Sequence, residues 1–128
     1  MNIGQASSGS GVSQRMIRHY EAIGLIPPPA RRDSGYRDYA EVDVARLRFI
    51  ANARDLGFPI EEIRELLSLW ADRDRSSAEV KTLALARAHE LHRKAAALEA
   101  MRRTLLDLAK RCQGDDRPDC PILAELAK

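Results

Sequence analysis

The feature that most constrains this fold is a long stretch without a helix-breaking residue. Between Ser76 and Gln113 the sequence contains no Gly and no Pro. Its apolar positions recur at steps of three and four residues, along Ala84, Ala88, Leu91, Ala95, Leu98, Met101, Leu105 and Leu108. This pattern predicts a helix over residues 76–111, about 50 Å long at about 1.5 Å per residue. Because a rod of this length cannot bury its apolar stripe against itself, we expect it to pair with another chain.

The rest of the chain is enough for one compact head. The chain has 128 residues, and only 5% of them are aromatic, so Leu, Ile, Val and Ala must build the core. No stretch approaches 18 apolar residues, and the N-terminus lacks the charged-then-apolar pattern of an export signal. We therefore expect a cytoplasmic protein without a membrane segment. Two cysteines in such a chain do not indicate a structural disulfide framework.

The first 24 residues have the pattern of a helix-turn-helix. Residues 3–8 predict a short helix, although the Ser and Gly residues at 7–11 favour helix weakly. Gly11 and Val12 indicate a turn. Ser13 is a good N-cap for a second helix, whose apolar residues are spaced by three and four, and Gly24 is a natural end for it. Two short helices joined by a Gly-containing turn are typical of helix-turn-helix proteins.

A hairpin and further helices are predicted after this motif. Residues 27–29 are all Pro, so the chain is extended there. The Ser34-Gly35 turn signal, with Arg32 before it and Tyr36, Arg37 and Tyr39 after it, predicts a small hairpin, or wing, over residues 31–39. Helical periodicity then runs from Val42 to near Gly57 and resumes after Pro59. Pro121 is well placed to begin a short final helix.

The N-terminal third has the residues needed to contact nucleic acid. All five basic residues of positions 1–40 are Arg, which pairs bidentately with phosphate and guanine, while Gln can pair with adenine. A solvated helix and a flexible hairpin are the plain alternative, and Tyr20 is equally compatible with a core position and a phosphate contact. The candidate DNA-binding residues are Gln14, Arg15, Arg18, Tyr20, Arg31, Tyr36 and Arg37.

Several segments together resemble the MerR family of transcription regulators. They are residues 17–21 (IRHYE), 24–26 (GLI), 35–39 (GYRDY) and 54–58 (RDLGF), together with the long helix. The resemblance implies a mainly helical, all-α fold with three parts: a winged helix-turn-helix head with a helical connector (1–72), an antiparallel coiled-coil dimerisation helix (76–111), and a metal-binding loop with a short helix (112–128). It also makes Arg18, Tyr36 and Arg37 the strongest candidates for DNA contact.

Cys112 and Cys120 are candidate metal ligands. They bracket a seven-residue loop that contains Gly, Pro and three Asp residues, a poor place to bury two small apolar side chains. Two thiolates suit a soft monovalent ion, whereas structural zinc takes four ligands. The segment resembles the CueR-type branch of the family, which implies Cu(I), with Ag(I) and Au(I) as alternatives. Relatives for divalent ions have a further Cys where this chain has Ser77. Lys81 resembles a residue that approaches the loop from the partner chain, or is an ordinary exposed lysine.

The expected function is that of a metal-responsive activator of efflux or detoxification genes, not an enzyme. By resemblance, a homodimer binds double-stranded promoter DNA and distorts it so that RNA polymerase can engage it. We find no nucleotide-binding Gly-rich loop, metalloprotease motif or Ser-His-Asp set. Two alternatives remain: a regulator that senses thiol oxidation through a Cys112–Cys120 disulfide, and a coiled-coil metal carrier that binds no DNA.

Overall fold

The computed structural model describes residues 1–128, which divide into two compact units, Met1–Leu83 and Ala84–Lys128. The elements along the chain are α1 (Ile3–Ser10), α2 (Gln14–Ala22), β1 (Ala30–Arg31), β2 (Arg37–Asp38), α3 (Glu41–Asp55), α4 (Ile60–Ala71), α5 (Ser77–Arg111) and α6 (Pro121–Leu126). The predicted mainly helical fold with a small wing is confirmed. None of the helices has both the length and the apolar character that crossing a membrane requires.

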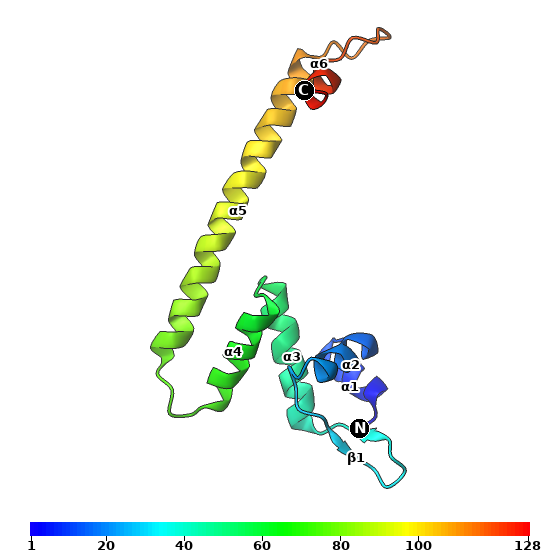
Figure 1. Cartoon of the computed structure of the whole chain (residues 1–128), viewed down its shortest axis with the longest axis vertical. Helices are drawn as coiled ribbons and strands as arrows, with labels where there is room; N and C mark the ends of the chain where they lie inside the picture. The colour runs from blue at the N-terminus through cyan, green and yellow to red at the C-terminus, as the bar shows by residue number, and fades with distance from the viewer. The chain divides into compact units, whose positions relative to one another are not determined.

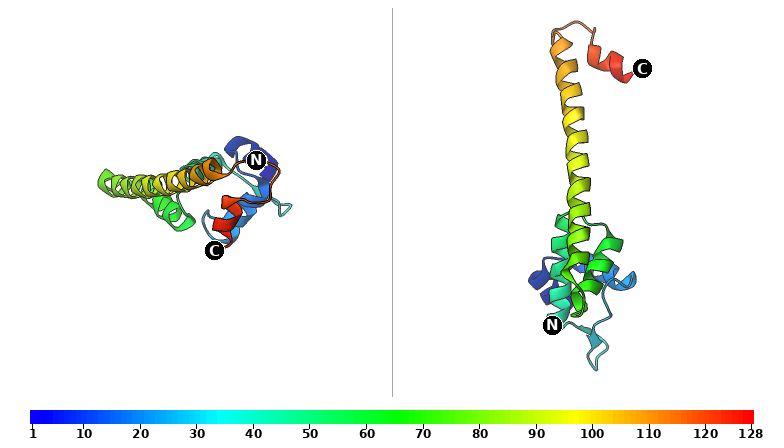
Figure 2. Two further views of the ribbon diagram at one scale, coloured as in Figure 1. Left: turned by 90° about the horizontal axis from the view of Figure 1, so that it is seen from above. Right: turned by 90° about the vertical axis from the view of Figure 1, so that its left-hand side faces the viewer.

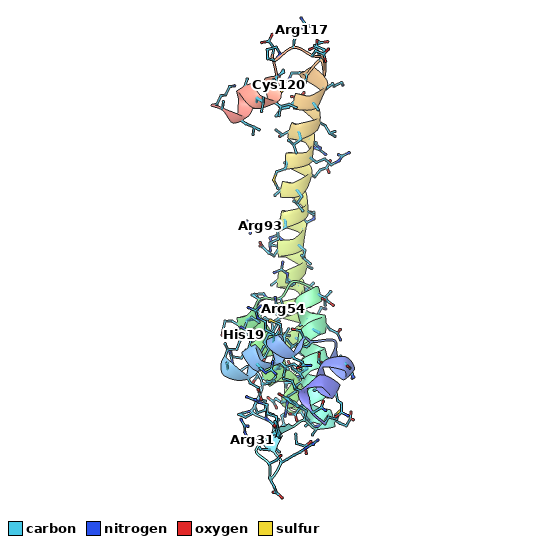
Figure 3. All side chains as sticks on the ribbon, turned by 90° about the vertical axis from the view of Figure 1, so that its right-hand side faces the viewer. His19, Arg31, Arg54, Arg93, Arg117 and Cys120 are labelled. Atoms are coloured by element: carbon cyan, nitrogen blue, oxygen red, sulfur yellow. The ribbon has the colours of Figure 1, made fainter.

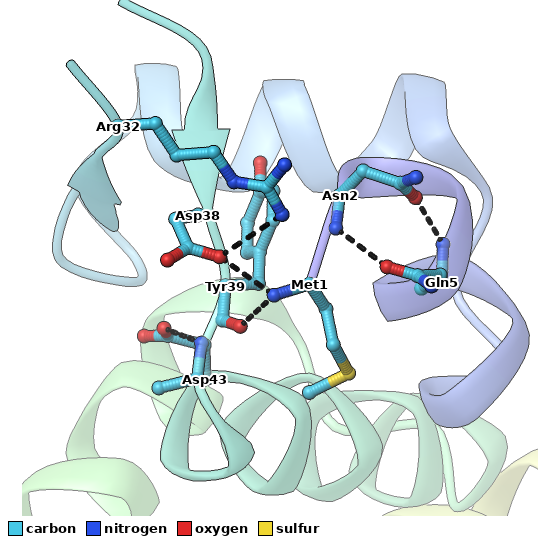
Figure 4. Close-up of polar contacts among 8 residues, drawn as sticks. Met1, Asn2, Gln5, Arg32, Asp38, Tyr39 and Asp43 are labelled. Atoms are coloured by element: carbon cyan, nitrogen blue, oxygen red, sulfur yellow. Dashed lines mark hydrogen bonds and ion pairs between the residues drawn. The ribbon is translucent and has the colours of Figure 1, made fainter. Parts of the chain in front are cut away.

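Helix α1 is longer than its composition predicts. The Asn2 side chain accepts a hydrogen bond from the Gln5 amide (2.8 Å), and the Gln5 side chain accepts one from the Asn2 amide (2.9 Å), as Figure 4 shows. This reciprocal capping satisfies two amides that the helix leaves free. At the other end Gly11 has a left-handed backbone (φ +77°) and donates its N–H to the Ser7 carbonyl. Caps and the burial of Ala6 therefore offset the weak propensity of the Ser and Gly residues.

Helix α2 begins and ends where the sequence predicts. The Ser13 hydroxyl accepts a hydrogen bond from the Met16 amide (3.2 Å), as an N-cap should. Ile17 and Tyr20 face the interior, one turn apart. The helix ends at Ala22, and Gly24 takes the left-handed conformation (φ +70°) that turns the chain toward the proline segment.

The wing is a two-stranded antiparallel hairpin. Ala30 pairs with Asp38 and Arg31 with Arg37. The Arg31 guanidinium reaches across the turn and donates to the Gly35 carbonyl (2.7 Å). The hairpin is therefore stabilised by one of its own arginines as well as by the strand pairing.

The core of the head lies where α3 packs on α1 and α4 (Figure 1). Ile17, Leu47, Ile50 and Ile63 are fully buried there. Helix α3 lacks a polar N-cap residue, and Asp43 supplies the missing contact by accepting the Ala40 amide (2.8 Å). The buried side chains place α2 on a scaffold of aliphatic residues.

Helix α5 is continuous over 35 residues, and in the C-terminal unit nearly all of its apolar side chains are exposed. The exposed set is Leu85, Leu91, Leu98, Met101, Leu105 and Leu106, and Leu108 is the one buried residue of the helix. Beyond it the chain reverses and α6 lies back along the end of α5 (Figures 1 and 2). Except for Leu108, the apolar stripe that the sequence predicts along α5 is exposed in the single chain.

Candidate nucleic-acid interface and metal centre

Four of the candidate DNA-binding residues line one surface hollow between α2 and the wing. Arg18 comes from α2, whereas Arg31, Tyr36 and Arg37 come from the hairpin. The Tyr36 side chain is 75% exposed at the rim. The fold thus joins the two segments that the sequence singled out separately into one cationic surface.

Gln14 and Arg15 lie on the first turn of α2 and are exposed. Polar and basic side chains near the N-terminal end of a recognition helix are those that reach base edges in the major groove. Neither Arg15 nor Arg18 forms an ion pair within the chain. Both guanidinium groups therefore remain available to a ligand.

The arginines of the wing have partners in the protein. Arg32 lies 3.5 Å from Asp38, whose pKa is lowered mainly by a hydrogen bond from the N-terminal ammonium group and then by Arg32 (Figure 4). Arg37 pairs with Glu21, with 2.9 Å between Nε and Oε2. These pairs link Arg32 to the opposite strand of the hairpin and Arg37 to α2.

The structure contradicts the assignment of Tyr20 to the interface. Its side chain is only 3% exposed and belongs to the core of the head. Its hydroxyl oxygen is 3.3 Å from Arg54 Nη1, which donates a hydrogen bond to it from α3. Because the ring packs inward and the hydroxyl accepts from Arg54, Tyr20 supports α2 from within the core of the head.

Two structural arginines were not found from the sequence. Arg64 of α4 donates to the carbonyls of Gly24 (2.9 Å) and Ile23 (3.2 Å), just past the end of α2. Arg48 of α3 donates to the Gly9 carbonyl (2.8 Å) near the end of α1. Helix C-termini carry free carbonyls and partial negative charge, so cations stabilise them. No local signal reveals these contacts, because they join residues about 40 positions apart.

The two cysteines come together at the end of α5, in the C-terminal unit. Cys112 follows the last turn of α5, and Cys120 immediately precedes α6; Figure 3 labels Cys120 there. Both thiols are free and half-buried. Backbone hydrogen bonds at Leu123 and then Ile122 lower the pKa of the Cys120 thiol, and a hydrogen bond with the Cys112 side chain acts in the same direction. The site thus favours a thiolate, the form of cysteine that binds metal.

The donor set of this site is small. No group of three or more His, Cys, Asp or Glu side chains is arranged to hold a metal ion, so His89 and His92 complete no such cluster. In the intervening loop Arg117 donates to Asp115 (2.9 Å from Nη2 to Oδ2), which lowers the pKa of that carboxyl. Asp115 is therefore occupied by an arginine, and the two sulfurs are the convergent donors. Such a set fits a soft ion of low coordination number.

A winged helix-turn-helix head with an arginine-lined hollow beside its second helix defines the class of DNA-binding transcription regulators. Comparison with known proteins identifies the family. Residues 1–70 match the family described as MerR HTH family regulatory protein, and residues 44–108 match the one described as MerR, DNA binding. The chain belongs to the MerR family of transcription regulators and is not an enzyme.

Individual relatives are similar over nearly the whole chain. Heavy metal-dependent transcription regulator 2 of Rhizobium meliloti is 59% identical, over 99% of this chain and 86% of that protein. The regulator CueR of Salmonella typhimurium is 41% identical, over 99% of this chain and 92% of that protein. Among solved structures, PbrR691 from Ralstonia metallidurans in complex with lead(II) has a TM-score of 0.85 at 34% identity and covers 98% of both chains.

Proposed function

We propose that this protein is a metal-responsive transcription activator that senses Cu(I), or the related ions Ag(I) and Au(I), at Cys112 and Cys120. It acts in the cytoplasm as a homodimer on double-stranded promoter DNA and makes the promoter accessible to RNA polymerase. The observation that carries the metal assignment is the pair of convergent thiols without a third donor. A structural zinc ion would require four ligands, more than this site offers.

The relatives support a heavy-metal ion as the inducer, without specifying which ion. One is named heavy metal-dependent, and structures similar to this chain hold lead(II) or mercury(II). The finer assignment to a monovalent ion rests on this chain's own residues. It has Ser77 at the start of α5, where the resemblance implies a further Cys in sensors of divalent ions. Soft thiolates select Cu(I) among the biological metals.

Charge balance at the site favours the same conclusion. Two thiolates and one monovalent cation leave a net charge of −1, which must be compensated when the site is half-buried. The backbone N–H groups of Ile122 and Leu123 supply part of that compensation. We assign a second part to Lys81 of the partner chain, because Lys81 is exposed on its own chain and carries no ion pair there.

The proposed DNA interface comprises Gln14, Arg15, Arg18, Arg31, Tyr36 and Arg37. Arg18 is assigned to a base edge because it lies on α2, unpaired, beside the wing. Arg18→Ala should cost about 1–3 kcal/mol of binding free energy and relax selectivity at one base pair. Gel-shift titrations against the operator and single-base variants measure both effects. Unchanged affinity and selectivity would remove Arg18 from the base-reading set.

The proposed switch works through geometry and not through release from DNA. When Cys112 and Cys120 bind the inducer, residues 113–119 and the start of α6 become fixed. Leu123 and Leu126, both exposed, can then dock on apolar surface of the dimer and select one arrangement of its two heads. The selected arrangement bends and untwists the promoter. Smooth bending of 20–30 base pairs costs on the order of 1–6 kcal/mol, which is within reach of such a docking step.

A competition titration tests the proposal. Promoter transcription is measured with the purified protein, RNA polymerase and graded Cu(I), Ag(I), Au(I), Zn(II) and Hg(II). We expect activation by the monovalent ions and none by Zn(II), and we expect DNA occupancy to stay nearly constant. Preferential activation by a divalent ion would contradict the monovalent assignment, and loss of DNA binding on metal addition would contradict the distortion mechanism.

A redox switch is the second candidate, because the two free thiols are neighbours: the Cys112 side chain contributes to the lowered pKa of Cys120. Under strictly reducing conditions a sensor that depends on a Cys112–Cys120 disulfide does not respond to Cu(I). A response under those conditions would therefore favour metal sensing and reject the redox alternative.

A further inference from the structure

A buried carboxylate lies beside the cationic surface. The side chain of Glu21, on α2, is only 9% exposed, and it shares a surface hollow with Arg18 and Arg37. Arg37 Nε lies 2.9 Å from one carboxylate oxygen of Glu21 and 3.2 Å from the other. This is the one ion pair that joins α2 to the wing.

The surroundings of Glu21 have a low effective dielectric. Tyr39, two residues beyond Arg37, is 2% exposed, and its hydroxyl has no hydrogen-bond partner. Burial raises the pKa of Tyr39, and the negative charge of Glu21 raises it further, so the carboxylate lies close to this ring. A buried carboxylate is tolerated only when it is paired and hydrogen-bonded. Arg37 provides the ion pair and a hydrogen bond to Oε1, whereas Oε2 is buried without a hydrogen-bond partner.

A negative charge on a surface that binds phosphates opposes binding by simple electrostatics. Its presence beside two exposed arginines therefore needs a local reason, and the geometry supplies one. Glu21 engages the Nε side of the Arg37 guanidinium, while the Arg37 side chain stays 38% exposed. The two terminal nitrogens remain free to donate to a ligand, in an orientation that α2 sets.

We propose that Glu21 is a positioning residue for DNA recognition, which locks the wing to the recognition helix and aims Arg37 at the phosphate backbone. This inference rests on the DNA interface proposed above. It predicts that removal of the Glu21 charge weakens DNA binding, although the same change makes the surface more positive.

The proposal is tested by whether loss of the Glu21 charge weakens or strengthens DNA binding. We expect Glu21→Gln, in the full-length dimer, to weaken operator binding by about tenfold, the loss expected when one charge-assisted contact is misplaced. Asp33→Asn is the matched control, because Asp33 lies on the same hairpin, is exposed and forms no ion pair. This control also removes one negative charge, and it should leave affinity unchanged or raise it. Operator affinity in Glu21→Gln that equals or exceeds that of the wild type would overturn the proposal.

A double-mutant cycle separates this inference from the interface on which it rests. In an Arg37→Ala background, Glu21→Gln should cause no further loss, because its effect runs through Arg37. Arg37→Lys keeps the charge but not the planar guanidinium, and it should weaken binding as Glu21→Gln does. If Glu21→Gln retains its full effect without Arg37, the positioning role is wrong while the interface stands. If Arg18→Ala and Arg37→Ala both leave DNA binding unchanged, the interface itself is wrong. Thermal melts establish that each variant is folded before it is compared.

Discussion

The head and the C-terminal unit use their apolar side chains in opposite ways. In the head, Ile17, Leu47, Ile50 and Ile63 are fully buried among three helices. In the C-terminal unit, Leu91, Leu98, Met101 and Leu105 are between 44% and 63% exposed. The first arrangement stabilises a fold within one chain, whereas the second leaves a contiguous apolar strip that a single helix cannot cover. The head therefore has a core of its own, whereas we expect the long helix to gain stability from a partner chain.

The polar contacts of the two regions also differ: those of the head join residues distant in sequence, whereas those of α5 join near neighbours. In the head, arginines bind groups far away in sequence, such as the Gly24 carbonyl for Arg64 and Glu21 for Arg37. Along α5 the ion pairs are local and exposed, as between Arg93 and Glu90, three residues apart. Exposed pairs of this kind contribute little to stability. Tertiary contacts thus define the head, while α5 is defined by its own sequence and by what binds its apolar strip.

The largest expected effect follows from charging that strip. Leu91→Glu combined with Leu98→Glu should convert the proposed homodimer into monomers, which lose tight operator binding because one head reaches one half-site. His89→Glu combined with Ala96→Glu is the matched control, since these positions have the same spacing and lie on the opposite face. Analytical ultracentrifugation and gel shifts measure both properties. A wild-type chain that sediments as a monomer at micromolar concentration would contradict the pairing of α5.

Substitution of either cysteine should abolish activation by metal while leaving DNA binding intact. Cys112→Ser and Cys120→Ser should each abolish activation by Cu(I), because one remaining thiolate cannot hold the ion. Operator affinity should stay close to that of the wild type, since the interface residues all belong to the other unit. In vitro transcription and gel shifts on the same samples separate the two properties. Normal Cu(I) activation in either variant would exclude this pair as the sensor.

Replacing one large apolar side chain by Ala in each unit tests the difference in burial between them. Ile50→Ala removes a fully buried side chain from the head and should lower the free energy of unfolding by about 2–5 kcal/mol. Leu105→Ala, on the exposed strip, should act through association, so its effect on melting should depend on protein concentration. Denaturant titrations at several concentrations measure both. A Leu105→Ala effect that is independent of concentration would show that this side chain is buried within its own chain.

Whether a feature of the fold could be predicted from the sequence depends on how far apart along the chain its contacting residues lie. The Ser13 cap, the Ser34-Gly35 turn and the long helix rest on contacts within a few residues, and the sequence pattern indicates each of them. Helix α1 was underestimated because its capping by Asn2 and Gln5 outweighs composition. The composition of the loop between Cys112 and Cys120 predicts a metal site. It does not show that backbone N–H groups of α6 favour the Cys120 thiolate.

The site residues illustrate the same limit. Arg18, Tyr36 and Arg37 could be selected because their residue types and motifs are distinctive, and the fold brings them together. Tyr20 could not be assigned from its neighbours, because its burial depends on α3 and on Arg54, 34 residues away. Nothing in the sequence distinguishes Glu21, since an isolated Glu on a helix is ordinarily solvated. Glu21 has a partner only because the wing places Arg37 beside α2.

The smallest expected effect concerns the link between α4 and the recognition helix. Arg64 donates two hydrogen bonds to the carbonyls of Ile23 and Gly24, where the helix dipole is negative. Its side chain is 40% exposed, so solvent screens much of the interaction, and Arg64→Ala should cost about 1 kcal/mol of stability. Arg64 also lies 3.6 Å from the exposed Glu61, and Glu61→Gln removes that ion pair while leaving the carbonyl contacts in place. We expect the control to leave the free energy of unfolding unchanged. In Arg64→Ala we expect faster amide exchange at the end of α2, because the carbonyls there lose their cation. Equal destabilisation by the two variants would assign the effect to the ion pair, and α4 would then hold the recognition helix by apolar packing alone.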